Sequence, residues 1–496
     1  MAQAKKTLHL SKDAIDSGID VKRLALLLLG IGLFFLVYYI PSLPDAVDPN
    51  GKVFQLTPQG KSALGLFLLA ATWWVFEVVP IGITGIMIAV MQSMFHIRDS
   101  RVAFTDFMDP SVWFIFGSIV FGLVFTKTGL AKRMAYKMLI LVGEKTSMIY
   151  LGCFLMTAIL TLIMAHTAVA ATLYPLFMSI YALYGEGDKP SRFGKGLFIG
   201  MAFTAGAGSI ITLLGAARGA VALGFFKDIV GREVSFFELS YYMAPLGMLM
   251  VFVLWAYIMI IYKPERASIP DLKKRAKSLE AHLGPVSLNE KLTLSIIFLT
   301  ISILGLRSFV PVLGAIDKST IILLSTIAFF LFNVLSIKDL EDIPWNIILL
   351  FGGAMSIGFC LWQTSAAEWL AIHWLTMFQN AHWFVFVIGI TFFVLIMTNL
   401  IMNVAAITIS LPVALIIAPY LNVSPEIILY ASLAAAGMPF LFLVGAAPNA
   451  IAYSSRQFTS GEFFMAGVPA SVVLLIVIGL FALFVWPMMG MPITLS

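Results

Sequence analysis

The sequence predicts an all-α integral membrane protein of about eleven transmembrane helices, arranged as two halves that repeat each other. Three observations lead to this fold class. The 496 residues are 60% hydrophobic and 11% charged, with a mean hydropathy of +0.98, whereas soluble domains are roughly 45–50% apolar and 25% charged. Apolar runs of about 20 residues recur along the chain. A glycine-containing, helix-breaking stretch occurs twice, each time deep in apolar sequence. We therefore expect a multi-pass protein of the plasma membrane.

The first half is expected to cover residues 24–262. Residues 1–23 are polar and basic and show no cleavable signal peptide, so we interpret them as a cytoplasmic tail before a retained first span. The expected elements of this half are spans at 24–40, 64–79, 81–95 and 111–127, an interrupted apolar stretch at 148–184, a broken helix at 196–226 and a span at 243–262. Each arm of 148–184 is barely long enough to span, so a re-entrant hairpin and two helices both remain open.

The two halves are joined by one long polar linker, residues 263–291, which is rich in lysine and arginine. The positive-inside rule places this linker in the cytoplasm, and with it the N-terminus, whereas the C-terminus falls outside. The second half, residues 292–496, is expected to contain spans at 292–306, 321–335, 345–361 and 472–488, an interrupted stretch at 384–421 and a broken helix at 427–453.

The two breaks are Gly215–Ala220 and Gly445–Ala450. A break inside a span leaves backbone N–H and C=O groups unpaired, and lipid offers them no partners. Such breaks persist where they line a protein-enclosed cavity or meet a ligand. Two broken helices in corresponding positions therefore predict a substrate site between the halves.

Other blocks repeat in the same order. Phe116-Gly117 corresponds to Phe351-Gly352, and His166-Thr167-Ala168 before Pro175 corresponds to Asn403-Val404-Ala405 before Pro412. An odd number of crossings between the copies gives them opposite orientation, which is the inverted-repeat architecture of transporters. Coincidence among Gly/Ala-rich spans is the alternative explanation.

The C-terminal region resembles a known family. Gly445–Ile451, followed by Phe458–Phe463 and Ala466–Pro469, is similar to the signature of the divalent-anion/sodium symporter family, the INDY-type di- and tricarboxylate transporters. The resemblance implies a scaffold domain, two re-entrant hairpins entering from opposite faces, a transport domain that moves as an elevator, and a homodimer in the lipid bilayer. It also implies Krebs-cycle carboxylates as substrates, with sulfate in a minority of members. It implies no cofactor, and nothing in the sequence points to nucleic acid.

The family motifs assign the site residues. Family members carry Ser-Asn-Thr at each hairpin tip and Gly-Thr-Pro-Pro at each break. The corresponding residues are expected to bind substrate and are here Ala165, His166, Thr167, Gly215, Ala216, Arg218, Met402, Asn403, Val404, Ala446, Ala447 and Pro448. If the protein is sodium-coupled, the ion ligands are expected among Thr161, Gly215, Thr398, Asn403 and Gly445.

Much of the oxygen-ligand shell is missing from these motifs, because Ala, Met and Val offer no side-chain oxygen to a hard cation. Two basic residues are present instead. An arginine in mid-membrane costs at least about 2.5–3.5 kcal/mol, so we expect Arg218 to face a cavity and a counter-charge. The alternative interpretation is that Arg218 is structural, with its side chain reaching the membrane interface by snorkelling or pairing with an acidic residue. His166 is equally well explained as a neutral, hydrogen-bonded residue or as a substrate-binding imidazolium.

These substitutions predict a sodium-independent exchanger of C4/C5 dicarboxylates such as 2-oxoglutarate, malate, succinate and fumarate. A fixed charge cannot leave with the substrate, so an empty carrier would have to move an uncompensated Arg218 through the gate at a cost of several kcal/mol. The alternative is a sodium-coupled di- or tricarboxylate symporter. A membrane enzyme or receptor is the least favoured class, because the sequence contains no zinc-protease, serine-elbow or phosphate-loop motif and no metal-ligand spacing.

Overall fold

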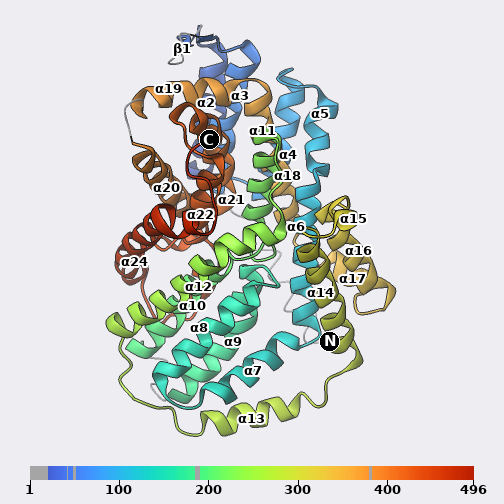
Figure 1. Cartoon of the computed structure of the whole chain (residues 1–496), viewed down its shortest axis with the longest axis vertical. Coiled ribbons are helices and arrows are strands. Elements are labelled where there is room, and N and C mark those ends of the chain that lie inside the picture. Colours follow the sequence, from blue (N-terminus) through green and yellow to red (C-terminus); the bar gives the residue numbers. More distant parts are fainter. Residues whose placement is uncertain (1–20, 42, 48–51, 185–189, 379–381, 496) are drawn as a thin grey trace.

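The computed structural model describes residues 21–41, 43–47, 52–184, 190–378 and 382–495, and the expected tail 1–23 lies almost entirely outside this range. The described chain is all-α apart from one two-stranded ribbon (Figure 1). Nine of its helices are long and apolar enough to cross a membrane, and four further apolar helices are shorter. The all-α membrane fold is therefore confirmed.

The first half contains α2 (Val21–Tyr39), the antiparallel strands β1 (Ala46–Val47) and β2 (Val53–Phe54), α3 (Pro58–Val75), α4 (Ile81–Met94), α5 (Ser100–Thr105), η1 (Asp106–Met108), α6 (Pro110–Lys127), α7 (Leu130–Val142), α8 (Thr146–Thr161), α9 (His166–Tyr184), α10 (Arg192–Gly208), α11 (Ala217–Val230) and α12 (Phe236–Ile261). Asp109 caps α6 by accepting a hydrogen bond from the Ser111 N–H at 2.7 Å. Helix α3 ends four residues before the expected span does, because Glu77 adopts a left-handed backbone conformation, φ +45°.

The second half begins after α13 (Leu272–His282), which lies within the linker. It contains α14 (Leu288–Leu306), α15 (Pro311–Gly314), α16 (Lys318–Leu331), α17 (Ile337–Glu341), α18 (Trp345–Gln363), α19 (Ala366–Phe378), α20 (Trp383–Leu400), α21 (Asn403–Ile417), η2 (Ala418–Leu421), α22 (Pro425–Gly437), η3 (Leu443–Gly445), α23 (Ala447–Tyr453), α24 (Ser460–Leu480), η4 (Phe481–Val485) and α25 (Trp486–Met488).

The interruptions expected from the sequence appear as gaps between helices. Four residues, 162–165, separate α8 from α9, which begins at His166, and two residues, 401–402, separate α20 from α21, which begins at Asn403. The two longer breaks cover residues 209–216, between α10 and α11, and 438–446, between α22 and α23. They lie earlier in the chain than expected: only Gly215–Ala216 and Gly445–Ala446 of the two expected stretches are in the gaps, and the residues after them already belong to α11 and α23. Each gap leaves the C-terminal end of one helix and the N-terminal end of the next inside the protein, where their unpaired backbone groups need partners.

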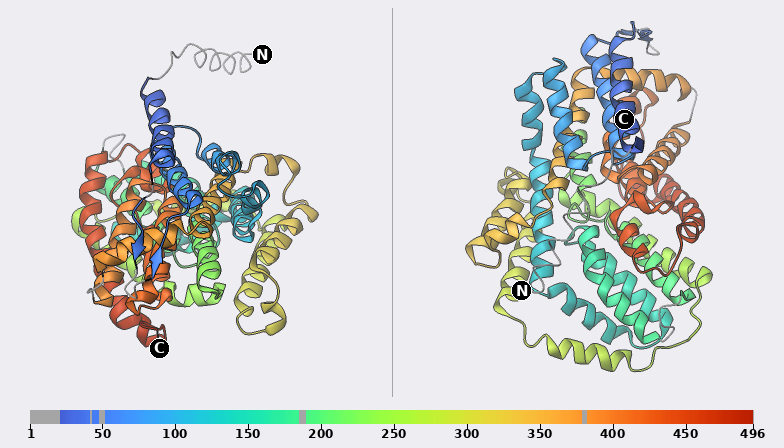
Figure 2. Two further views of the ribbon diagram at one scale, coloured as in Figure 1. Left: turned by 90° about the horizontal axis from the view of Figure 1, so that it is seen from above. Right: turned by 180° about the vertical axis from the view of Figure 1, so that it is seen from behind.

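The helices form an elongated body with the breaks near its middle. In Figure 1, α7 to α10 and α12 lie towards one end, α2, α3 and α19 lie towards the other, and α11 and α22 lie between them. Figure 2 places α14 and α16 on one side of this body and α24 on the opposite side. The breaks therefore occupy the centre, where both halves contribute helices.

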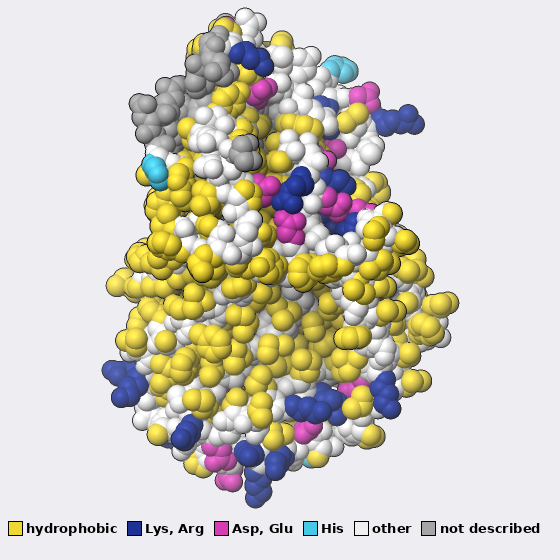
Figure 3. Space-filling model, in the orientation of Figure 1, with side chains coloured by type: hydrophobic (Ala, Val, Ile, Leu, Met, Phe, Trp, Pro, Cys, Tyr) yellow, Lys and Arg dark blue, Asp and Glu magenta, His cyan; other side chains and the backbone are white. Residues whose placement is uncertain are grey.

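The surface matches a bilayer environment. Apolar side chains cover a broad band of the surface in Figure 3. Many large apolar side chains are exposed, for example Phe298, 75% exposed, and Leu331, 72% exposed. Lysine and arginine side chains gather at the end of the molecule that carries α13 (Figure 3). An apolar band with a basic end is what a multi-pass membrane protein presents.

Candidate functional site

The first hairpin tip rests on the first break. The His166 backbone N–H donates a hydrogen bond to the Gly215 carbonyl at 2.9 Å, and Nδ1 of the same histidine lies 3.2 Å from that oxygen. The Thr212 hydroxyl donates to the Leu162 carbonyl at 2.9 Å. A Cβ atom at position 215 would lie 2.7 Å from the carbonyl oxygens of both Thr161 and Ser209, so only glycine fits here. The tip and the break thus satisfy each other's backbone groups.

The second break is contacted by two asparagines, one in α20, the helix before the second tip, and one in α23. The Leu441 N–H donates to Asn399 Oδ1 at 2.7 Å, and Asn449 Nδ2 donates to the carbonyls of Pro439 and Phe442 at 2.8 and 3.1 Å. A Cβ atom at Gly445 would lie 3.0 Å from the Thr398 carbonyl. Asn399 and Asn449 therefore hold the second break. Neither asparagine is among the predicted site residues, although a buried asparagine inside an apolar span is a signal for a structural or functional role.

The halves interlock at these two places. Helix α9, which begins at the first tip, packs against α23, which follows the second break. Helix α21, which begins at the second tip, packs against α11, which follows the first break. The helix that begins at each tip thus packs against the helix that follows the break of the other half.

Arg218 lies inside the protein and not at the surface. Its side chain is 1% exposed, and Nη2 donates a hydrogen bond to Ser209 Oγ at 2.8 Å. Nη1 is buried without a hydrogen-bond partner. Arg218 lines a small cavity with Ile210, Thr212 and residues of α12 and α22. The snorkelling alternative is inconsistent with this position.

The expected acidic counter-charge is missing. Among the described residues, none forms an ion pair with Arg218. Two helix ends approach the guanidinium instead. Ser209 is the C-cap of α10, and a Cβ atom built on Gly437, the last residue of α22, would lie 2.7 Å from Arg218 Nη2. Because helix C-termini carry partial negative charge, they offset part of the arginine charge.

The other candidate residues differ in how deeply they are buried. Ala216, Asn403, Val404 and Pro448 are buried, Ala165, Thr167, Met402 and Ala446 are half-buried, and Ala447 is exposed. Of the sodium candidates, Thr161 donates its hydroxyl hydrogen to the Ala158 carbonyl at 2.6 Å and Thr398 donates to the Ala436 carbonyl at 3.1 Å. The described residues contain no group of three or more His, Cys, Asp or Glu side chains that could hold a metal ion.

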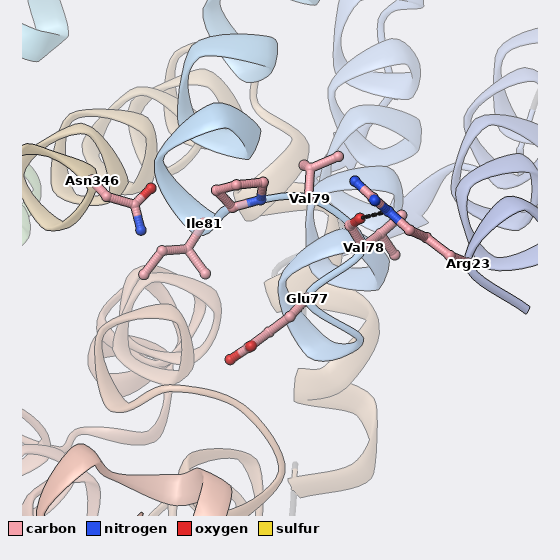
Figure 4. Close-up of a pocket in the computed structure, with 7 residues that line it drawn as sticks. Arg23, Glu77, Val78, Val79, Ile81 and Asn346 are labelled. Carbon is pink, nitrogen blue, oxygen red and sulfur yellow. Dashed lines mark hydrogen bonds between the residues drawn. The ribbon is translucent and has the colours of Figure 1, made fainter. Parts of the chain in front are cut away.

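A more open cavity lies at the turn between α3 and α4 (Figure 4). It is lined by Arg23, Glu77, Pro80 and Asn346, among others, and includes none of the predicted site residues. Arg23 Nε donates to the Val78 carbonyl at 2.8 Å, while the Glu77 carboxylate points away from Arg23. This cavity is therefore separate from the region of the breaks.

Comparison with known proteins gives a family model and full-length relatives. The model described as "Sodium:sulfate symporter transmembrane region" matches residues 27–492. The sodium-dependent dicarboxylate transporter SdcS of Staphylococcus saprophyticus is 24% identical over all of this chain and 97% of its own length. SdcS of Staphylococcus aureus is 22% identical over 84% of this chain and 85% of its own.

Two solved structures share the fold. MtrF of Neisseria gonorrhoeae has a TM-score of 0.58 at 12% identity and covers 96% of both chains. The YdaH transporter of Alcanivorax borkumensis has a TM-score of 0.57 at 13% identity and covers 96% of this chain and 99% of its own. At this level of identity the likeness concerns the fold alone.

Proposed function

Because this chain belongs to the sodium:sulfate symporter family, also called the divalent-anion/sodium symporter family, we propose that it carries C4/C5 dicarboxylates across the plasma membrane by secondary transport. The relatives named as dicarboxylate transporters support this substrate class, since they align over nearly the whole chain. Succinate, malate, fumarate and 2-oxoglutarate are the candidate substrates.

The observation that carries the proposal is the buried, acid-free Arg218. A buried guanidinium with one unpaired nitrogen is an unfavourable arrangement unless an anion completes it. A carboxylate does so with charge-assisted hydrogen bonds. The N-terminal ends of α9, α11 and α21 at the tips and the first break add donor N–H groups for the anion. We further propose the elevator movement and the homodimer that the family resemblance implies.

The relatives favour sodium coupling over the exchange that the sequence predicted. Their names state sodium dependence, and two or more coupled sodium ions would neutralise a dianion during its crossing. In this chain, Thr161, Thr398, Asn403 and the backbone carbonyls at the breaks would supply the oxygen ligands that sodium prefers. Sodium-coupled dicarboxylate symport is therefore the first candidate for the coupling mechanism.

Sodium-independent exchange remains a second candidate because of where Arg218 lies. Its guanidinium occupies the C-terminal ends of α10 and α22, and half-helix C-termini are where cations bind in transporters with broken helices. The Gly215 carbonyl, a candidate sodium ligand, already accepts hydrogen bonds from His166. Because this positive charge is fixed to the chain, the carrier would cross the membrane readily only when the dianion is bound.

Uptake of labelled succinate into proteoliposomes tests both levels of the proposal. Four conditions are compared: external sodium or choline, each with and without internal malate. Symport predicts uptake into empty vesicles that requires sodium. Exchange predicts uptake that requires internal malate and is unchanged by choline. Dicarboxylate transport itself would be contradicted if no uptake occurs in any of the four conditions, provided that a cooperative thermal unfolding transition shows the protein to be folded.

A binding measurement separates the coupling mechanisms without transport. A ligand that binds only the folded protein stabilises it by about 2.7 kcal/mol at 100 times its Kd. Symport therefore predicts that sodium chloride raises the unfolding temperature in detergent above that in choline chloride. Exchange predicts equal values for the two salts and a rise with succinate alone.

A further inference from the structure

We propose that Ser209 and Gly437 are positioning residues that orient the Arg218 guanidinium, so that Nη1 receives a carboxylate oxygen of the substrate. The proposal rests on the proposed dicarboxylate transport and extends it to two residues that no motif singles out. It assigns one guanidinium nitrogen to the protein and another to the ligand.

Ser209 holds one side of the guanidinium. Its hydroxyl oxygen accepts from Arg218 Nη2 at 2.8 Å and donates to the Gly206 carbonyl at 2.7 Å. Ser209 is 2% exposed, so no solvent replaces either bond. The serine therefore uses its donor on its own helix and its acceptor on Nη2, which fixes the rotation of the guanidinium plane about the side chain.

Gly437 makes room for the guanidinium in the opposite half of the chain. A Cβ atom there would lie 2.7 Å from Arg218 Nη2 and 3.2 Å from Cζ. The same atom would lie 2.2 Å from Ile210 Cγ2. The backbone of Gly437 is not in a left-handed conformation, so the glycine is required for space and not for its φ angle. Any side chain at this position would have to displace the guanidinium and Ile210.

Nη1 is the guanidinium nitrogen that is buried without a hydrogen-bond partner among the described residues. Arg218 lines a cavity of about 10 Å³ with Ala216 and Gly219, so a carboxylate oxygen reaches the guanidinium only when this cavity widens. An unpaired cationic donor in a low-dielectric site is strongly stabilised by an anionic acceptor. We therefore place the carboxylate oxygen of the ligand at Nη1. The contacts of Nη2 with Ser209 and Gly437 set the orientation of the guanidinium and hence the direction in which Nη1 donates.

The test adds a methyl group at Gly437 and, in the same protein, removes the side-chain atom of Ile210 that this methyl group would also contact. Ile210→Ala deletes the Cγ2 atom, so in Ile210→Ala/Gly437→Ala the contact with Arg218 is the shortest that remains. We expect this double variant to raise the KM for succinate at least about tenfold relative to Ile210→Ala alone, a change that corresponds to 1.4 kcal/mol, with a smaller change in kcat. Gly305→Ala, where nothing lies within 4 Å of the added atom, is the matched control and should transport as the parent does.

Ser209→Ala provides an independent arm if the double variant fails to fold. Removal of the hydroxyl frees Nη2, so KM should rise in the same direction, and the succinate-induced rise in unfolding temperature should shrink. The proposal is overturned if a folded Ile210→Ala/Gly437→Ala variant, or Ser209→Ala when the double variant does not fold, shows the KM and ligand-induced stabilisation of its reference. A parent protein that carries no dicarboxylate overturns the proposed function and this inference together, whereas an active parent with unaffected variants overturns only the inference.

Discussion

Two nitrogen atoms of His166, the backbone N and the ring Nδ1, lie at 2.9 and 3.2 Å from the same acceptor, the carbonyl oxygen of Gly215. Because a carbonyl only accepts, Nδ1 must carry a hydrogen. The neutral tautomer protonated at Nδ1 satisfies this bond. His166 is buried, and it begins α9, where the helix N-terminus disfavours a positive charge. We therefore interpret His166 as a neutral residue that locks the first tip onto the first break.

This interpretation predicts a flat pH profile. Initial rates of fumarate transport, whose carboxyl groups both stay ionised in this range, should change less than about twofold between pH 6.5 and 9 at constant ionic strength. His166→Asn should lower the rate at every pH without changing the shape of the profile. A loss of rate at alkaline pH that disappears in His166→Asn would show that the imidazolium is the working form.

Arg218 is predicted to be essential for transport and dispensable for folding. Arg218→Met retains most of the side-chain volume, removes the charge and leaves no buried carboxylate unpaired, since no acid among the described residues pairs with it. Its unfolding temperature in detergent should equal or exceed that of the parent. Succinate transport should fall by at least about 100-fold, the equivalent of roughly 2.7 kcal/mol.

Two variants accompany this measurement. Arg218→Lys should recover little transport, because an ammonium group lacks the second nitrogen that reaches Ser209. Arg101→Met, which removes an exposed arginine of α5, should leave transport unchanged. If Arg218→Met transports as well as the parent, Arg218 has no part in the site.

Much of the fold could be predicted from the sequence because its determinants are local. Apolar runs predict spans, and glycine, proline and asparagine within such runs predict interruptions, since helix breaking depends on the backbone of the residues concerned. The hairpin tip expected at Ala165–Thr167 coincides with the start of α9, and that expected at Met402–Val404 with the start of α21. The end of α3 could not be placed, because the left-handed turn at Glu77 has no signature in its residue type.

The surroundings of Arg218 could not be predicted for the opposite reason. Arginine in an apolar span predicts a cavity and a counter-charge, and the cavity is present. The counter-charge is shared between two helix ends, one of which comes from the other half of the chain. A contact between α11 and Gly437 depends on how the halves interlock, and neither composition nor periodicity contains that information. The sequence could only indicate that a partner was needed.

The Arg133–Glu290 pair is predicted to be the strongest link between α7 and the start of α14. Arg133 Nε donates to Glu290 Oε1 at 2.7 Å, Nη2 donates to Oε2 at 3.2 Å, and Nη1 donates to the Gly284 carbonyl at 3.0 Å. Both side chains are at least nine-tenths buried. Arg133→Met should therefore destabilise the protein by about 3–5 kcal/mol, because it leaves the Glu290 carboxylate buried and unpaired.

The matched control is Lys132→Met, which removes an exposed charge from the same helix and should change stability by less than about 0.5 kcal/mol. Chemical unfolding in mixed micelles measures both variants. Restoration of part of the loss in Arg133→Met/Glu290→Gln would identify the uncompensated carboxylate as the cause. Equal stability of the Arg133→Met and Lys132→Met variants would instead mean that water reaches Glu290 once the arginine is removed.

Asp339 lies in the short helix α17, between α16 and α18. Lys127 Nζ donates to Asp339 Oδ2 at 2.6 Å, and the Ser336 N–H donates to the same oxygen at 2.7 Å. Burial opposes ionisation of this carboxyl, but the hydrogen bonds from Lys127 and Ser336 outweigh it and lower the pKa of Asp339 to about 2. In the unfolded chain an aspartate has a pKa of about 3.9. A carboxyl whose pKa is lowered on folding contributes stability that is complete above its unfolded pKa and is lost as the pH falls through its folded pKa. The contribution of Asp339 should thus be full above about pH 4 and disappear towards pH 2.

Lys127→Met raises the folded pKa of Asp339, so the difference in unfolding temperature between this variant and the parent should be constant from pH 7 to pH 5 and narrow steadily below pH 4. Lys132→Met should run parallel to the parent throughout, and a Lys127→Met curve that also ran parallel down to pH 2 would show that Lys127 does not stabilise the ionised carboxylate.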